Sequence, residues 1–224
     1  MKCFYLLTPM ENAYDELSQE WNEYKQRPLP AFNLLLPLGH DGICLDAGTG
    51  NGRHLSLLSQ KYSEVYAIDN SQKLLSIAAT NNAALKNVHF DFSDITLLPF
   101  ENKMFDDVYC VAVLHHLPTQ TIQVAFKEIH RVLKTNGLLI ASVWNKEQAK
   151  FTNLQKEDYV SWKMKTGKTV KRFIHFFEEE EIKQLAKEND FNIVEIFYEK
   201  NGKKTTEKSE AGNLCFVLQK KEAA

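Results

Sequence analysis

The sequence is poor in the residues that build disulfide frameworks and cysteine-based metal sites. Its four cysteines are scattered along 224 residues, no C-x-x-C pair occurs, and Cys44 and Cys110 lie in apolar runs. This pattern is typical of core thiols in a reducing compartment. The apolar run Cys3–Leu7 is too short for a secretion signal or a membrane span. We therefore expect a cytoplasmic protein that makes no membrane contact.

An excess of charge of one sign is lacking as well. Lysine and arginine number 27 and the acids 29, which gives a formal net charge of −2. Without a global positive field, any contact with nucleic acid must come from a local patch or a partner. Internal repeats and a second-domain boundary are also absent. With 44% hydrophobic residues, we expect residues 1–224 to form one α/β domain.

What the sequence does contain is a glycine turn between an apolar run and a helix-like stretch. Ile43–Leu45 reads as a buried strand, and three glycines spaced G-x-G-x-G follow the acid Asp46. The dinucleotide fingerprint G-x-G-x-x-G would require glycine where Arg53 stands. A second acid, Asp69, closes the next apolar stretch, and at a strand tip it can accept hydrogen bonds from a ribose diol.

Together these residues resemble the class I S-adenosylmethionine-dependent methyltransferases. The resemblance implies that the cofactor binds at Asp46, Gly48, Thr49, Gly50, Gly52, Asp69, Asn70, Asp94 and Ala112. In this family the glycine turn lines the methionine and ribose, and an acid in the place of Asp94 reaches the adenine. The residues alone leave plainer alternatives open, because the turn could only pack helix on strand and Asp94 could only cap a turn.

The remainder of the chain alternates strands and helices. Strands are expected at 64–69, 88–92, 106–114, 138–144, 192–199 and 213–220, and helices at 71–84, 120–134 and 178–189. This order predicts an α/β, Rossmann-like class I methyltransferase fold. The expected sheet is mostly parallel and seven-stranded, with helices on both faces and a C-terminal antiparallel hairpin. Ligands would gather at the carboxyl ends of the strands.

Two segments depart from this rhythm. Tyr14, Leu17, Trp21 and Tyr24 place one apolar stripe on a helix over 12–26, which Pro28 and Pro30 end. The helix could dock on the sheet, or residues 12–38 could form a helical lid over the cofactor. Residues 145–173 are polar and rich in lysine, which predicts an insertion or long loop after the fifth strand.

The pair His115-His116 follows the fourth strand and therefore lies at the rim expected to hold the methyl acceptor. Neighbouring side chains of an extended segment point to opposite sides, so we expect one histidine to face the site and the other to pack. No acid or cysteine cluster accompanies them, and we expect no metal. Further along, segments 158–163 and 171–177 interleave basic and aromatic residues, which suits RNA binding or an amphipathic cover over the sheet.

More specific stretches are similar to the tRNA wobble-uridine carboxymethyl methyltransferases, which include the methyltransferase part of an alkB homologue. The matching stretches are 27–30, 46–55, 112–116, 140–144, 159–163 and 172–185. The resemblance implies methyl transfer to the carboxylate of a modified wobble uridine in tRNA. It also implies a small zinc-binding activator protein docked at the edge strand 88–92. Leu29 and Ser161 depart from the family pattern and leave the acceptor open.

A carboxylate acceptor is already ionised near pH 7, so the site needs a dry pocket and one or two positioning groups rather than a strong base. Candidates for this catalytic role are Lys25, Arg27, His116 and Arg172. Of these, Lys25 and Arg27 are expected near the RNA backbone. Two alternatives share the cofactor residues: a small-molecule methyltransferase of the quinone or sterol type, and a catalytically silent cofactor-binding scaffold subunit.

Overall fold

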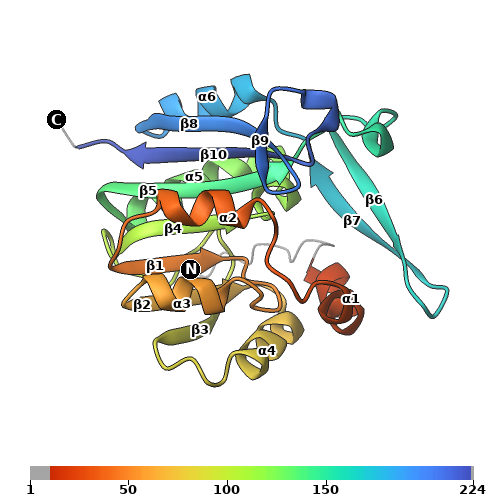
Figure 1. Cartoon of the computed structure of the whole chain (residues 1–224), viewed down its shortest axis with the longest axis horizontal. Coiled ribbons are helices and arrows are strands. Elements are labelled where there is room, and N and C mark those ends of the chain that lie inside the picture. Colours follow the sequence, from red (N-terminus) through yellow and green to blue (C-terminus); the bar gives the residue numbers. More distant parts are fainter. Residues whose placement is uncertain (1–10, 223–224) are drawn as a thin grey trace, which may run out of the picture.

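The computed structural model describes residues 11–222, so the predicted N-terminal run Cys3–Leu7 lies outside the described residues. Eight strands form one sheet in the order β3-β2-β1-β4-β5-β10-β8-β9. The first five of these strands are parallel, and β10 runs antiparallel to both β5 and β8 (Figure 1). The α/β fold and the antiparallel C-terminal pair are therefore confirmed.

The strands of this sheet are β1 (Ile43–Ala47), β2 (Glu64–Asp69), β3 (Val88–Phe92), β4 (Phe105–Val111), β5 (Leu133–Trp144), β8 (Phe191–Lys200), β9 (Lys203–Thr205) and β10 (Asn213–Lys220). The α-helices are α1 (Glu11–Tyr24), α2 (Phe32–Leu35), α3 (Leu55–Lys61), α4 (Gln72–Asn81), α5 (Thr119–Val132) and α6 (Glu179–Glu188). Helix α4 begins after Ser71, whose hydroxyl accepts the Leu74 N–H at 3.2 Å as a side-chain N-cap.

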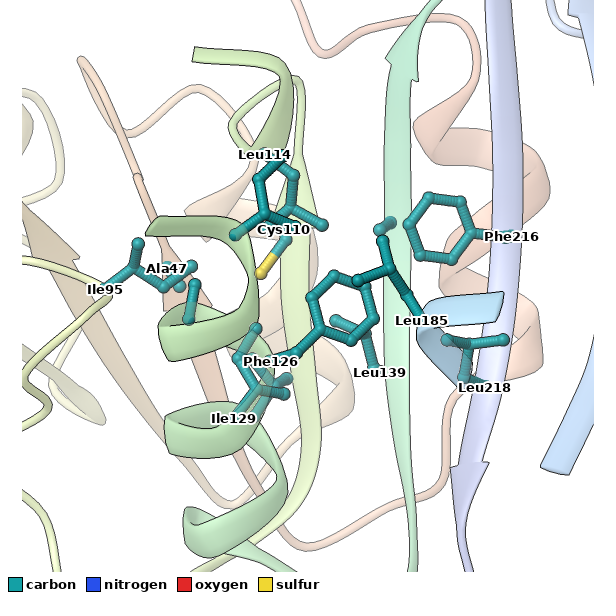
Figure 2. Close-up of a cluster of buried hydrophobic side chains, with 14 of the residues drawn as sticks. Ala47, Ile95, Cys110, Leu114, Phe126, Ile129, Leu139, Leu185, Phe216 and Leu218 are labelled. Atoms are coloured by element: carbon teal, nitrogen blue, oxygen red, sulfur yellow. The ribbon is translucent and has the colours of Figure 1, made fainter. Parts of the chain in front are cut away.

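Two apolar clusters lie on the two faces of the sheet. Helices α5 and α6 cover one face, where Phe126 packs among Cys110, Leu139 and Phe216 (Figure 2). Short helices α2 and α3 cover the other face with Phe32, Leu35, Leu55 and Leu58, all fully buried. The strands between them are buried on both sides, which explains their near-continuous apolar runs.

The expected seven-stranded sheet was one strand short. Three residues, Lys203–Thr205, pair antiparallel with the end of β8 and add the edge strand β9 between the two predicted C-terminal strands. Strand β4 also ends earlier than predicted, at Val111, because Ala112 takes a positive φ of 61° and a 3-10 turn, η2 (Leu114–His116), follows.

The segment predicted as an insertion, 145–173, contains structure of its own. After a short 3-10 turn, η3 (Ala149–Phe151), strands β6 (Glu157–Lys163) and β7 (Thr169–His175) pair antiparallel as a separate two-stranded sheet. This hairpin leaves the main sheet and passes beside α1 (Figure 1). Buried His175 ties it to the body, with Nε2 at 3.0 Å from Glu181 and Nδ1 at 3.2 Å from Thr119.

Among residues 11–222, no helix is long and apolar enough to cross a bilayer. The same residues contain no group of three or more histidine, cysteine or acidic side chains arranged to hold a metal ion.

Candidate active site

A pocket opens at the carboxyl ends of β1, β2 and β4, beneath α1. It encloses about 910 Å³ of empty space, open mouth included. Among the predicted cofactor residues, the pocket is lined by Gly48, Thr49, Gly50, Asp69, Asn70, Asp94 and Ala112. Asp46 and Gly52 lie just outside the lining, and of the predicted acceptor residues only His116 reaches it.

The glycine turn has the backbone geometry that its sequence requires, but its amides are largely used inside the protein. Gly48, Gly50 and Gly52 all have positive φ, and a Cβ on Gly52 would overlap the side-chain amide of Asn82. The N–H groups of Gly48 and Thr49 both donate to the Ile68 carbonyl, at 2.8 and 2.9 Å. The turn therefore admits a ligand by close backbone approach, because the N–H groups of Gly48 and Thr49 are not free to donate to it.

Two buried acids lie below this turn. The Asp69 carboxylate accepts the N–H of Gly50 at 2.7 Å and that of Ser71 at 2.8 Å. Asp46 is 2% exposed, and its Oδ2 has no hydrogen-bond partner within residues 11–222. Burial raises the pKa of each carboxyl to about 6. The pocket thus holds negative charge that a cationic or hydroxyl-bearing ligand would stabilise.

Asp94 combines the two roles that the sequence left open. Its Oδ1 accepts the N–H and the hydroxyl of Thr96 at 2.8 and 2.6 Å, as a turn-capping aspartate does. Its Oδ2 accepts the Asn70 side-chain amide at 3.3 Å, and both residues line the pocket. Asn70 therefore orients Asp94. Ala112 lines the opposite side, with its N–H donated to Ser142 at 2.9 Å.

Helix α1 lies over the pocket and is held by side-chain hydrogen bonds at both ends. Near its start, Asp15 accepts the Ser71 hydroxyl at 2.5 Å and the Lys73 N–H at 3.1 Å. Near its end, Asn51 of the glycine turn donates to Asn22 and to the Lys25 carbonyl, both at 3.0 Å. Tyr14 and Trp21, between these anchors, contribute the upper wall of the pocket.

The two histidines lie in the turn η2 rather than in an extended segment, and they have different environments. His115 is fully buried and stacks on Trp144, with ring centroids 5.1 Å apart. His116 lines the pocket, donates from Nδ1 to the Phe173 carbonyl at 2.9 Å, and accepts the Tyr14 hydroxyl at Nε2 at 2.6 Å. Burial lowers the pKa of His116 to about 4. His116 is therefore neutral at pH 7 and offers hydrogen bonding rather than positive charge.

Arg172 of β7 is buried among three tryptophans. Its guanidinium carbon lies 5.3 Å from the ring centroids of Trp144 and Trp162 and 5.8 Å from that of Trp21. The side chain is 5% exposed, and within residues 11–222 its Nε has no hydrogen-bond partner and no carboxylate forms an ion pair with it. A buried guanidinium is rarely left without an anion. We call Arg172 with these three indoles the arginine cage.

Other cations gather around the arginine cage. Lys25 lies 5.8 Å from the Trp21 ring and 5.9 Å from Trp162, and burial together with the charge of Arg53 lowers its pKa. Lys150 lies 5.3 Å from the Trp144 ring. Arg27, by contrast, is exposed and makes no contact with the pocket. The structure therefore brings Lys25, His116 and Arg172 together and leaves Arg27 apart.

Arg53 is the site residue that the sequence reasoning missed. It was noted only as the residue that breaks the dinucleotide fingerprint, yet its side chain lines the pocket. Burial lowers the pKa of its guanidinium to about 10, against the opposing effect of nearby Asp46. Its place directly after the last glycine of the turn is the signal that could have found it. Lys150 gave no signal, because a lysine in a polar insertion resembles any solvated lysine.

The residues present fit S-adenosylmethionine. Asp46 has an orphaned buried carboxylate oxygen that suits the ammonium of the methionine part. Asp69 retains free lone pairs at the tip of β2 that suit the ribose hydroxyls. Asn70 follows Asp69 directly and Asp94 follows the next strand, β3, and both line the side of the pocket where the adenine would extend.

Comparison with known proteins agrees with this fit. Residues 45–141 match the sequence profile of the methyltransferase domain. A candidate methyltransferase of Encephalitozoon cuniculi is 30% identical over 193 residues, which are 81% of this chain and 86% of that protein. The tRNA (carboxymethyluridine(34)-5-O)-methyltransferase of Arabidopsis thaliana is 30% identical over 143 residues, 62% of this chain and 33% of that enzyme.

A third relative has another kind of acceptor in its name. The malonyl-acyl-carrier-protein O-methyltransferase of a Marinomonas species is 30% identical over 139 residues, 59% of this chain and 50% of that enzyme. The chain thus spans half or less of the length of this relative and of the Arabidopsis enzyme.

Solved structures share the fold. An S-adenosylmethionine-dependent methyltransferase from Clostridium acetobutylicum superposes with a TM-score of 0.74 at 16% identity, covering 94% of this chain and all of that one. A Haloferax volcanii methyltransferase, solved in complex with the Trm112 methyltransferase activator, gives 0.72 at 14% identity, covering 96% and 99%. With the pocket and the relatives in agreement, the chain belongs to the S-adenosylmethionine-dependent methyltransferases.

Proposed function

We propose that this enzyme methylates the carboxylate of a carboxymethyl-type uridine at the wobble position of tRNA. The observation that carries the proposal is the arginine cage beside the cofactor pocket. Arg172 is a buried cation without an anionic partner among residues 11–222, and the adjoining Lys25, Arg53 and Lys150 are all positive. A site with this charge favours an acceptor that brings its own negative charge.

The relatives support an acceptor of the same chemistry. The name of the Arabidopsis enzyme specifies a carboxymethyluridine of tRNA, that of the Marinomonas enzyme specifies a malonyl group, and both specify transfer to oxygen. A carboxymethyl group and a malonyl half-ester each end in a free carboxylate. The quinone and sterol acceptors considered from the sequence have none, so they leave Arg172 without a partner. The basic and aromatic hairpin β6–β7 favours the RNA-borne acceptor over the carrier-protein one.

The residues of the site suffice for this reaction. When bound, the cofactor supplies an electrophilic methyl group on a positively charged sulfur. Arg172 holds the acceptor carboxylate and orients one oxygen toward the pocket. The acceptor is ionised near pH 7, so no residue needs to remove a proton. Neutral His116, fixed by Tyr14 and Phe173, can neither protonate the carboxylate nor compete with Arg172 for it.

The enclosing aromatic residues supply the other requirement. Trp21, Trp144 and Trp162 exclude water around the guanidinium, which strengthens its interaction with a carboxylate. They also restrict the acceptor to one approach, so that orientation provides much of the rate enhancement. A single guanidinium among neutral rings positions the carboxylate without a second buried ion pair that would blunt its nucleophilicity.

The test is mass spectrometry of the reaction products, after digestion to nucleosides in the case of tRNA. Purified enzyme and S-adenosylmethionine are incubated with tRNA carrying 5-carboxymethyluridine, with malonyl-acyl-carrier protein, and with a small quinone. The proposal predicts a new methyl ester on the tRNA nucleoside alone. Methylation of the carrier protein or the quinone but not of the tRNA would overturn it, and absence of transfer to all three would favour the silent scaffold.

A matched pair of variants tests the arginine cage. Arg172→Ala should lower methyl transfer at least tenfold while S-adenosylhomocysteine affinity stays within about twofold, because a hydrogen bond to a charged group contributes about 1.5–3 kcal/mol. Lys171→Ala is the control, because Lys171 directly precedes Arg172 in β7 and its side chain is exposed, away from the arginine cage. Equal activity of the two variants would remove Arg172 from the site.

We further propose a small zinc-binding activator protein as partner at β3. As predicted, β3 is an edge strand of the sheet. Phe92 is 53% exposed on it and Leu97 is 77% exposed just after it, whereas Val88 and Phe90 are half-buried against the core. Part of the expected apolar face is therefore core, and the part near Phe92 remains for a partner strand. The Haloferax complex supports an activator as the partner class.

The register of β3 decides how this partner is tested. Val65 donates to Asn87 at 2.8 Å and Ser93 donates to Asp69 at 3.2 Å, so odd-numbered residues of β3 turn their backbone groups toward β2. Even-numbered residues turn theirs outward, because the two sides of a parallel strand alternate. A proline at His89 would therefore disrupt the pairing of β3 with β2 and could not probe the free edge. The informative change is Phe92→Pro, which removes an outward N–H.

Phe92→Ala is the matched control for this change, because it removes the same ring but keeps the N–H. Co-purification with the activator should be lost in Phe92→Pro and weakened in Phe92→Ala. Retention of the partner by a folded Phe92→Pro protein would show that it binds elsewhere.

A further inference from the structure

A second hollow lies beside the arginine cage, on the outer side of Trp162. It is an open groove with about 790 Å³ of empty space, mouth included, between the end of α1 and the turn end of β6. Tyr24 and Lys25 line it from α1, and Trp162 and Lys163–Lys165 line it from the hairpin. We call it the α1–β6 groove. Nothing in the chemistry of methyl transfer requires it.

The groove is held in a fixed shape by one buried acid. Glu20 is 7% exposed, and its two carboxylate oxygens accept the Trp162 indole N–H at 2.8 Å and the Lys165 N–H at 2.9 Å. Because Trp162 is fixed through its indole nitrogen, its ring stands as a wall between two compartments. Arg172 lies 5.3 Å from its centroid, and the groove opens along the same ring. A ligand in the groove is thus a direct neighbour of an acceptor at Arg172.

Aromatic surface and positive charge coincide in this groove. Tyr24 is 56% exposed, with its ring centroid 6.1 Å from that of Trp162. Lys165 lies over Tyr24 and is paired with Glu23 at 2.5 Å, so most of its charge is already balanced. Lys25 and exposed Lys163 have no ion pair within residues 11–222. Nearby Arg53, Arg172 and Lys150 repel Lys25, which a bound anion would relieve.

An exposed ring beside two unbalanced lysines fits one class of ligand, a nucleotide of a single strand. Bases stack on aromatic side chains irrespective of sequence, and the backbone phosphates pair with lysine. We propose that the α1–β6 groove binds a nucleotide adjacent to the methyl acceptor, with its base on Tyr24 and its phosphate between Lys25 and Lys163. This inference rests on the proposed function, because it takes the acceptor to be part of an RNA strand.

The α1–β6 groove would bind the RNA strand through the neighbouring nucleotide, without contacting the modified base. Trp162 separates the two sites, so the acceptor carboxylate meets Arg172 while its neighbour in the strand meets Tyr24. Recognition by stacking explains how a chain of net charge −2 binds a polyanion through a local patch. It also predicts little preference for the identity of the neighbouring base.

The experiment measures binding of a fluorescein-labelled, nine-nucleotide single-stranded RNA with an unmodified uridine at its centre. Fluorescence anisotropy is recorded in the presence of S-adenosylhomocysteine, for the wild type and for Tyr24→Ala, Tyr24→Phe, Lys163→Ala and Tyr159→Ala. Tyr159 is the control, because it is 50% exposed and packs on Phe173 on the outer face of the same hairpin. Urea unfolding of every variant shows that it is folded.

Tyr24→Ala should weaken RNA binding about 5–150-fold, the range that loss of one base–aromatic stack produces. Tyr24→Phe should restore it, since the ring remains. Lys163→Ala should reduce the slope of log affinity against log salt by about 0.7, as expected for one lost phosphate contact on a single strand. RNA affinity of the Tyr24→Ala protein within twofold of the wild type would refute nucleotide binding in the α1–β6 groove. An equal loss of affinity in Tyr159→Ala would also refute it.

Methylation of free 5-carboxymethyluridine nucleoside by the wild type, measured in parallel, separates this inference from the proposed function. Tyr24-dependent RNA binding without nucleoside methylation would refute carboxymethyluridine as the acceptor and support nucleotide binding in the α1–β6 groove. Nucleoside methylation with RNA binding that does not depend on Tyr24 would refute nucleotide binding in the α1–β6 groove and support carboxymethyluridine as the acceptor.

Discussion

Replacing Asp46 by asparagine should raise the free energy of unfolding of the cofactor-free protein and weaken cofactor binding. The carboxylate is buried, and its Oδ2 has no hydrogen-bond partner within residues 11–222. A pKa raised to about 6 from an ordinary value near 3.9 corresponds to about 3 kcal/mol of unfavourable free energy at pH 7. Part of this penalty is shared with neighbouring Asp69 and part falls on the new amide, so we expect a gain of about 1–2 kcal/mol.

The pH dependence identifies the cause. Because the folded state holds this proton more tightly than the unfolded state, the Asp46 contribution is absent below about pH 4 and becomes fully unfavourable above pH 6. The stability difference between Asp46→Asn and the wild type should therefore grow between pH 4 and pH 6 and stay constant above. Urea unfolding curves at steps of half a pH unit, without cofactor, measure it.

Cofactor affinity should change in the opposite direction. Asparagine keeps the shape of the side chain but loses the charge that we assign to the methionine ammonium. Calorimetry with S-adenosylmethionine at pH 7.5 should show a Kd increased about 10–150-fold, equivalent to about 1.5–3 kcal/mol. Asp91→Asn, on the exposed edge strand, is the control and should change neither quantity. An Asp46→Asn protein with wild-type stability and wild-type affinity would refute the whole reasoning.

Three further predictions concern the same pocket. Asp69→Ala should raise the cofactor Kd about 10–150-fold in calorimetry, since two ribose hydroxyls lose a charged acceptor; unchanged affinity would exclude Asp69 from the site. Gly52→Ala should lower the free energy of unfolding by about 1–3 kcal/mol, because φ is +77° and the new Cβ would overlap the Asn82 amide; a neutral result in urea unfolding would contradict the turn geometry. Tyr14→Phe should lower kcat on tRNA several-fold with little effect on cofactor affinity, because His116 loses the hydroxyl that orients it; a change in cofactor Kd alone would argue for a different role.

The fold was predictable wherever one local pattern dominates. Strands β2, β3 and β10 begin and end at the residues that the apolar runs predicted, because acids, asparagines and glycines bound those runs. The early end of β4 was not predictable, because a left-handed alanine at 112 has no sequence signature. Strand β9 was missed for a similar reason, since three polar residues carry no periodicity and form a strand only against β8.

The hairpin β6–β7 shows why part of the site could not be read from the sequence. Its inward face alternates Val160 and Trp162 with Val170, Arg172 and Ile174, and the arginine interrupts the apolar pattern. What makes that arginine an inward residue is aromatic surface supplied by α1, β5 and β6 together. No local window contains these three elements. The sequence could name Arg172 only through its resemblance to a family.

The anchored position of α1 has a consequence for the order of events in a catalytic cycle. Tyr14 and Trp21 close the cofactor pocket from above, while the arginine cage and the α1–β6 groove lie along the outer side of the same helix. An RNA strand seated there would press on α1 and block the way out beneath it. We therefore expect compulsory-order kinetics, in which the cofactor enters first and the demethylated product leaves last. Release of that product, rather than methyl transfer, would then limit turnover, and steady-state rates would fall as solvent viscosity rises.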